Sequence, residues 1–124
     1  MKPYKVLIVE DELIIALSLK KELEQEGYQV MGVASSADDA VNTAREQKPD
    51  IILMDILLKG TKTGLEAAHE IVDFLKTKFI FLTGNIYMID QDERSLNTDY
   101  SVLGKPVNHN ELKDAIQIIF SGKS

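Results

Sequence analysis

The stretch Ile51-Ile52-Leu53-Met54-Asp55 decides the fold, because four large apolar residues in a row end in an acid. Pro49 comes shortly before this run and Gly60 soon after it, so the run is too short for a free-standing helix. It is typical of a strand buried on both faces, as in a parallel sheet covered by helices. Asp55 then lies at the carboxyl end of the strand, which is the edge where open α/β sheets bind ligands.

The rest of the chain alternates between short apolar runs and segments with helical spacing. The other expected strands are residues 6–9, 28–33, 79–82 and 101–103. The expected helices are residues 12–26, 36–47 and 65–75, a short one with a weak apolar face at 85–97, and a last one that Asn108 caps. Ser35 and Ser36 offer N-caps for the second of these helices. This alternation predicts an α/β fold, a doubly wound five-stranded parallel sheet with five helices on its two faces.

Length and composition limit the class of protein. The 124 residues suffice for a real core, and we expect residues 1–124 to form one domain. The net charge of −6, with no basic stretch, argues against binding of nucleic acid or an anionic membrane by the chain itself. The sequence has no cysteine, which excludes disulfides and thiolate metal sites. It shows no signal peptide and no membrane-length apolar run, so we expect a cytoplasmic protein.

Polar residues follow four of the five expected strands. The first strand ends in Glu10 and Asp11, the third in Asp55, the fourth in Thr83 and the fifth in Lys105. If these strands lie side by side, their ends form one cleft. Three close carboxylates repel one another, and Mg²⁺, which prefers oxygen ligands, relieves that repulsion. The lysine suits a phosphoryl oxygen, the threonine offers a hydrogen-bond donor, and a carboxylate can itself form an aspartyl-phosphate.

Each motif taken alone has a plainer explanation. Asp55 alone would cap a turn, and Glu10, Asp11 and Glu12 would be acids that the helix dipole favours. It is their combination with the threonine and the lysine, each at a strand end, that favours the functional interpretation. The two histidines, His69 and His109, are expected to be solvent-facing helix residues.

With these motifs in order, the chain resembles the receiver domain of two-component response regulators over essentially its whole length. The motifs are the acidic pair, Met54-Asp55, Leu82-Thr83-Gly84 and Gly104-Lys105-Pro106. The resemblance implies a flavodoxin-like receiver fold with strand order 2-1-3-4-5. It also implies that Asp55 accepts a phosphoryl group, in a Mg²⁺-dependent reaction, from the phosphohistidine of a sensor histidine kinase or phosphotransfer protein.

The same resemblance implies roles for the residues around Asp55. Asp11 and Asp55 would bind Mg²⁺ directly, Glu10 would act mostly through water, and the backbone carbonyl of Leu57 would complete the protein ligands. Lys105 would contact the phosphoryl group, and the bond from Lys105 to the following proline would be cis. Thr83 would move toward the phosphate and report its arrival to the surface.

Two departures from the family pattern concern the switch and the loop. Three residues before the lysine, where the family often has Tyr or Phe, this chain has Val102, and Tyr100 lies two residues earlier on the same strand face. We therefore predict that the aromatic part of the switch is absent or altered. The loop after Asp55 is apolar near the site and one residue longer than the common pattern, and it places Leu57 beside the phosphate.

We expect a signalling phosphoacceptor rather than an enzyme. We expect no output domain after the last helix, and therefore expect a downstream protein or a second copy of the chain to read the surface of the fourth helix, fifth strand and fifth helix. An aspartate-nucleophile phosphatase is one alternative, but Leu57 stands where such enzymes usually carry a second acid. A degenerate receiver that acts as a phosphorylation-independent binding module is the other, and the intact set of acids, threonine and lysine argues against it.

Overall fold

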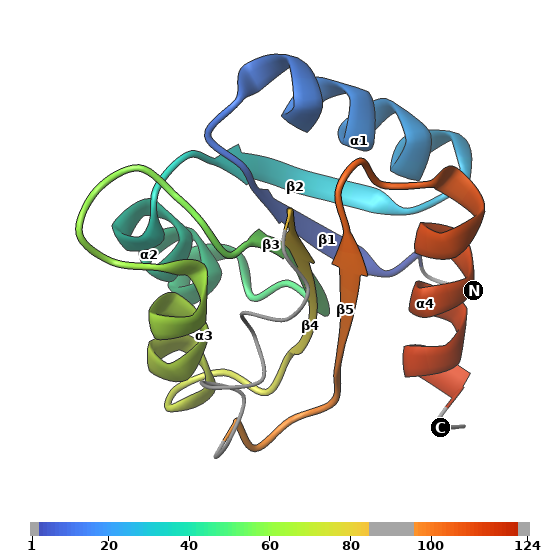
Figure 1. Ribbon diagram of the computed structural model, residues 1–124. Coiled ribbons are helices and arrows are strands. Elements are labelled where there is room, and N and C mark those ends of the chain that lie inside the picture. The colour runs from blue at the N-terminus through green and yellow to red at the C-terminus, as the bar shows by residue number, and fades with distance from the viewer. Residues whose placement is uncertain (1–2, 85–95, 122–124) are drawn as a thin grey trace.

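A computed structural model describes residues 3–84 and 96–121 of the chain, and in it all five expected strands form one parallel sheet (Figure 1). The strands are β1 (Lys5–Val9), β2 (Gln29–Ala34), β3 (Ile51–Asp55), β4 (Lys78–Thr83) and β5 (Tyr100–Gly104). Their order is β2-β1-β3-β4-β5, which confirms the predicted fold and strand order. The strand around Asp55 is the centre of the sheet, since β1 pairs with it on one side and β4 on the other.

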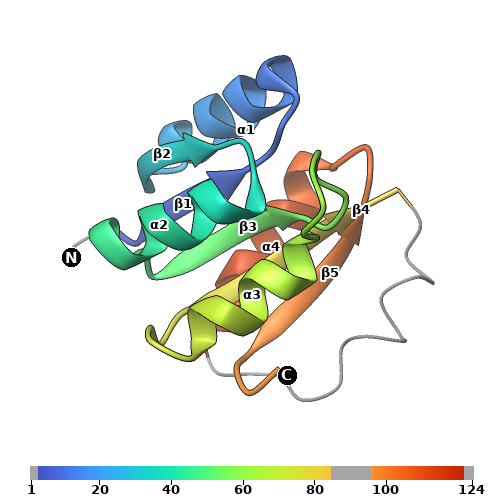
Figure 2. The same ribbon diagram turned by 90° about the vertical axis from the view of Figure 1, so that its left-hand side faces the viewer.

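Helices cover both faces of the sheet, as expected for a doubly wound fold (Figure 2). They are α1 (Leu13–Gln25), α2 (Ala37–Gln47), α3 (Gly64–Val72) and α4 (His109–Ser121). The helix expected at 85–97 lies mostly outside the described residues, and its last two positions, Leu96 and Asn97, are not helical. None of the four described helices has the length and apolar character that a bilayer-spanning segment requires.

The sheet separates two apolar cores. One core contains the alternate residues of β1, β3 and β4 that face α2 and α3, and the other contains the residues that face α1 and α4. Every residue of β3 is buried, which explains why its sequence reads as an unbroken apolar run rather than an alternation. Asp55 is the polar exception, and it is the last residue of the strand.

Local signals explain where α2 and α3 begin. The Ser36 hydroxyl caps α2 by accepting a hydrogen bond from the Asp39 N–H at 3.1 Å, as its position predicted. Helix α3 begins one residue earlier than expected, because Thr63 and Glu66 form a capping box. The Thr-x-x-Glu spacing was the signal for this start.

The end of α3 differs from the sequence expectation, which continued the helix to Leu75. The helix ends at Val72, and the chain then makes a tight turn in which the N–H groups of Asp73 and Phe74 bond to carbonyls only three residues back. The Phe74 ring lies 4.0 Å from the Arg45 guanidinium of α2, and Phe74 and Leu75 still pack against the core. The apolar spacing that predicted a longer helix therefore serves a packed turn.

Candidate functional site

The parallel register brings the carboxyl ends of β1, β3, β4 and β5 to one edge of the molecule. Asp55 lies level with Leu82, and Thr83 lies level with Gly104. Glu10 and Asp11 come directly after β1, and Lys105 comes directly after β5. All of the residues predicted for the site from strand ends therefore lie at this edge, which we call the carboxyl edge.

Lys105 joins the two most buried acids of the carboxyl edge. Its ammonium nitrogen lies 2.8 Å from Asp55 Oδ2 and 2.9 Å from Glu10 Oε1. The side chain of Glu10 is 0% exposed and that of Asp55 6%, so water compensates their charges only weakly. One ammonium thus balances two carboxylates in a poorly solvated place, which leaves a net negative charge.

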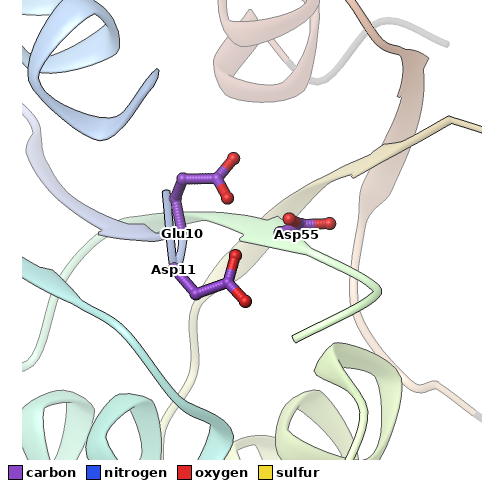
Figure 3. A group of neighbouring side chains, drawn as sticks. All are labelled: Glu10, Asp11 and Asp55. Atoms are coloured by element: carbon purple, nitrogen blue, oxygen red, sulfur yellow. The ribbon is translucent and has the colours of Figure 1, made fainter. Parts of the chain in front are cut away.

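Asp11 adds a third carboxylate to this group. Glu10, Asp11 and Asp55 each offer one carboxylate oxygen, and these oxygens all lie within 4.8 Å of one another (Figure 3). A hard divalent cation is bound by oxygen ligands and compensates the negative charge that Lys105 leaves over. The donor set therefore fits Mg²⁺, and Asp11, the most exposed of the three, faces the solvent from which an ion would enter.

The pKa values of Glu10 and Lys105 reflect this crowding. Burial raises the pKa of the Glu10 carboxyl, and the neighbouring Asp55 raises it further, although the hydrogen bond from Lys105 opposes both. For the Lys105 ammonium, partial burial acts to lower the pKa, but the hydrogen bonds to Asp55 and Glu10 outweigh it, and the pKa is raised. Lys105 is therefore fully charged at neutral pH, whereas the surroundings of Glu10 disfavour its ionised form.

A cavity of about 320 Å³ opens over the Asp55 carboxylate. It is lined by Asp11, Glu12, Asp55, Leu57, Lys59, Gly84 and Lys105. The Leu57 N–H donates to Asp55 Oδ1 at 3.2 Å, while the Leu57 side chain is largely exposed beside the cavity. The backbone of the predicted fourth metal ligand thus contacts Asp55, and its side chain borders the space over that acid, as the sequence predicted.

Thr83 and its neighbour strand complete the edge. Thr83 is buried, and its backbone carbonyl accepts a hydrogen bond from the Lys105 N–H at 2.8 Å. The bond between Lys105 and Pro106 is cis, as the resemblance implied. Val102 and Tyr100 both pack against the same core, which confirms that they share a strand face.

Two backbone features of the site were missed by sequence reasoning. The Lys59 N–H donates to Asp11 Oδ2 at 3.1 Å, a contact that no side-chain pattern encodes. Gly64, the first residue of α3, lies so close to β3 that a Cβ atom there would overlap the backbone oxygen of Asp55. Its N–H also donates to the Ile56 carbonyl at 2.8 Å, which closes the loop between β3 and α3. A glycine at the start of a helix was the available signal for this close approach.

The fold and the acidic carboxyl edge define a receiver-type α/β domain. The comparison with protein families agrees, because residues 6–117 match the family described as response regulator receiver domain. The chain belongs to that family.

Individual relatives support the same assignment. The transcriptional regulatory protein PdtaR of Mycobacterium tuberculosis is 33% identical over 120 residues, which are 96% of this chain and 58% of that protein. The chain therefore spans little more than half the length of this relative.

Solved receiver structures have the same fold. The signal receiver domain of a modulated diguanylate cyclase from Desulfovibrio desulfuricans G20 superposes with a TM-score of 0.80 at 33% identity, over 97% of this chain and 95% of that one. A CheY-like receiver domain protein from Methanospirillum hungatei JF-1 gives a TM-score of 0.86 at 26% identity, with the same coverage of both chains.

Proposed function

We propose that the chain is a phosphorylation-driven switch whose phosphoacceptor is Asp55. The observation that carries the proposal is the buried Asp55 carboxylate, with the Lys105 ammonium at 2.8 Å and two further acids beside it under an open cavity. A lone structural acid needs neither two further carboxylates beside it nor the cavity.

The proposed reaction moves a phosphoryl group from a phosphohistidine of a sensor histidine kinase or phosphotransfer protein. A carboxylate oxygen of Asp55 attacks phosphorus, a P–O bond forms, the P–N bond breaks, and the electron pair stays on the imidazole nitrogen, which takes up a proton. Lys105 would hold the transferred group through a phosphoryl oxygen, since its ammonium already lies at Asp55 Oδ2. Bound Mg²⁺, held by Asp11, Asp55, the Leu57 carbonyl and, through water, Glu10, would supply charge neutralisation of the phosphoryl oxygens.

Signal output would begin at Thr83, which lies between the phosphoacceptor and β5. The added negative charge and acceptor oxygens would favour a new position of its hydroxyl group, and so bias the surface of β5 and α4. We propose that a downstream protein or a second copy of this chain reads that surface together with the predicted helix at 85–97, most of which lies outside the described residues. The longer relative PdtaR is named a transcriptional regulatory protein. In a longer protein that contains this chain, the regulatory output could use the same surface.

Two other functions are weaker. A phosphatase with an aspartate nucleophile would use an acid two residues after it, but Leu57 occupies that place and its side chain cannot donate a proton. A phosphorylation-independent binding module would not need three converging carboxylates and a partly buried ammonium. We therefore keep a non-enzymatic, cytoplasmic signalling role as the proposal.

Phosphoryl uptake can be tested directly. The protein is incubated with Mg²⁺ and acetyl phosphate, or with beryllofluoride, and the covalent or bound adduct is measured by intact mass and by NMR. We expect one adduct per chain, absent from Asp55→Asn and retained by Asp99→Asn, which makes the same change at an exposed acid that pairs with Lys78. If the wild-type protein forms no adduct, the phosphoacceptor role is wrong; many turnovers of a stable phosphoester would instead support the phosphatase.

A further inference from the structure

The loop between β3 and α3 forms one wall of the candidate site, yet only its first residue, Ile56, is buried. Hydrogen bonds hold its two ends, because the Leu57 N–H bonds to Asp55 and the Gly64 N–H bonds to the Ile56 carbonyl. Between them the loop turns at Gly60, whose φ of 109° lies in the region that favours glycine. Ile56 and Leu58 still pack with the core under α2 and α3, but residues 59–63 have no large apolar side chain. Such a segment has a low local stability unless polar contacts restrain it.

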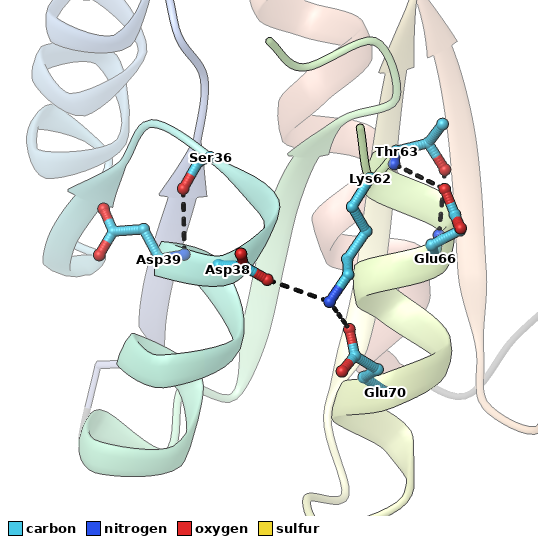
Figure 4. A network of polar contacts seen from close by, with 7 residues as sticks. All are labelled: Ser36, Asp38, Asp39, Lys62, Thr63, Glu66 and Glu70. Atoms are coloured by element: carbon cyan, nitrogen blue, oxygen red, sulfur yellow. Dashed lines mark hydrogen bonds and ion pairs between the residues drawn. The ribbon is translucent and has the colours of Figure 1, made fainter. Parts of the chain in front are cut away.

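Lys62 supplies such contacts at the outer part of the loop (Figure 4). Its ammonium nitrogen lies 2.6 Å from Glu70 Oε2 on α3 and 3.0 Å from Asp38 Oδ1 on α2. One side chain thus links the loop to two helices, and those helices pack side by side over the same core. The hydrogen bonds to Glu70 and Asp38 raise the pKa of the Lys62 ammonium, so its charge is constant over the ordinary pH range.

The restrained loop contains a backbone N–H that bonds to an acid of the site and the carbonyl that we propose as a metal ligand. The Lys59 N–H holds Asp11 Oδ2 at 3.1 Å, and Leu57, whose carbonyl is the proposed metal ligand, lies two residues earlier. Lys62 is only three residues after Lys59, and Thr63, which caps α3, follows it directly. A shift of the loop at Lys62 would therefore move both backbone groups relative to Asp11 and Asp55.

We infer that Lys62 is a positioning residue for the phosphoacceptor site. By pairing with Asp38 and Glu70 it fixes the loop, so that the Leu57 carbonyl and the Lys59 N–H keep their places, and it thereby strengthens Mg²⁺ binding at Asp11 and Asp55. The inference rests on the proposed function. Its alternative is an ordinary surface ion pair with no effect on the site, since exposed pairs contribute little to stability.

The sign of the effect separates the two explanations. Removal of a lysine near a cation site, considered as long-range electrostatics alone, would strengthen Mg²⁺ binding because one repelling positive charge is lost. Loss of loop positioning would weaken it. The Lys78–Asp99 pair offers a matched control, because Lys78 is as exposed as Lys62 and pairs at 2.9 Å, but at the opposite end of β4.

The experiment compares wild type, Lys62→Met, Lys62→Arg and Lys78→Met. Mg²⁺ affinity is measured by calorimetry, and hydrogen exchange of the Lys59 amide is measured by NMR on the metal-free protein. We expect Lys62→Met to weaken Mg²⁺ binding roughly threefold and to speed Lys59 exchange by a similar factor. Lys62→Arg should keep the wild-type Mg²⁺ affinity and Lys59 exchange rate, and Lys78→Met should resemble wild type. About 1 M salt should reduce the difference between Lys62→Met and wild type, because it screens the ion pairs of Lys62.

The inference and the proposed function fail in different ways. If wild type binds Mg²⁺ and takes a phosphoryl group on Asp55 while Lys62→Met equals Lys78→Met in both measurements, the positioning role is overturned and the function stands. Tighter Mg²⁺ binding by Lys62→Met would also overturn it. If wild type binds no Mg²⁺ and takes no phosphoryl group, the proposed function fails, and the role of Lys62 fails with it.

Discussion

The two edges of the sheet carry similar residues in very different surroundings. At the carboxyl edge, Lys105 lies between two buried carboxylates, with a third acid close by. At the amino edge, where β4 and β5 begin, Lys78 pairs with the exposed Asp99 at 2.9 Å. The first cluster has an excess of buried negative charge, whereas the second is neutral and solvated.

Cavity size does not mark the carboxyl edge as the functional edge. The amino edge borders a cavity of about 610 Å³, larger than the 320 Å³ cavity over Asp55. Each edge also contains a buried threonine, Thr83 at the end of β4 and Thr77 just before its start. What sets the carboxyl edge apart is uncompensated charge held out of water, a condition that costs stability and that a ligand can relieve.

The largest effect is expected from crowding at the carboxyl edge. Gly64→Ala places a methyl group against the backbone oxygen of Asp55 and the side chain of Met54, so the start of α3 must move. We expect a loss of roughly 3 kcal/mol in the free energy of unfolding, measured with urea. Gly104→Ala is the control, because a Cβ there meets nothing within 4 Å. Equal losses in both variants would contradict the close packing of α3 on β3.

The next effect tests the uncompensated charge. Lys105→Met leaves the buried carboxylates of Glu10 and Asp55 without their cation, and we expect the metal-free protein to lose roughly 2 kcal/mol of unfolding free energy at neutral pH. Lys78→Met at the amino edge should cost less than about 0.5 kcal/mol. A similar small cost at both edges would mean that water solvates the carboxyl edge as well.

A gain of stability is expected when the excess charge is reduced. Glu10→Gln removes one of the two carboxylates that share Lys105, and should add roughly 1 kcal/mol to the metal-free protein at neutral pH while weakening Mg²⁺ binding. Because the pKa of Glu10 is raised in the folded chain, the folded state binds its proton more tightly than the unfolded state does. Wild type should therefore gain unfolding free energy as the pH falls from neutral toward 4.5, the ordinary pKa of a glutamate carboxyl. The difference in unfolding free energy between wild type and Glu10→Gln should narrow over the same range. A difference that stays constant with pH would show that the Glu10 charge is not the cause.

The smallest effect concerns the threonine of the amino edge. The Thr77 hydroxyl is buried and has no hydrogen-bond partner among the described residues. Thr77→Val replaces it with a methyl group of similar size, and we expect unfolding free energy to stay equal or rise by about 0.5 kcal/mol. Phosphoryl uptake and its proposed coupling to partner binding should both be unaffected in Thr77→Val. Thr83→Val should instead lose that coupling. A marked loss of stability in Thr77→Val would reveal a partner for that hydroxyl.

The sequence predicted the carboxyl edge well because its chemistry follows apolar runs. Asp55 and Thr83 are the last residues of their strands and Lys105 follows its strand directly, so topology alone brings them together. The contacts of the β3–α3 loop could not be predicted in the same way. The partner of Lys62 on α2 lies 24 residues away, and the Lys59 contact to Asp11 uses a backbone N–H that every residue except proline has.

The helix ends show the same division. The positions of Ser35 and Ser36 predicted a cap, and Ser36 forms it. The Thr-x-x-Glu spacing of Thr63 and Glu66 was a sufficient signal for the capping box of α3. The early end of α3 was not, because Leu75 continues the apolar spacing even though the chain has already turned. Periodicity reports which side chains are buried, and it does not report whether the backbone between them is helical.

The Lys105 contacts also bear on how the protein is made. They join residues 95 and 50 positions apart in the sequence, to Glu10 and Asp55 respectively. A ribosome translating this chain exposes both acids long before the lysine leaves the exit tunnel, so a growing chain with only the first four strands holds them without their cation. The last strand and helix therefore complete the electrostatics of the site as well as the sheet, and a truncated translation product would lack the cation that pairs with the proposed phosphoacceptor.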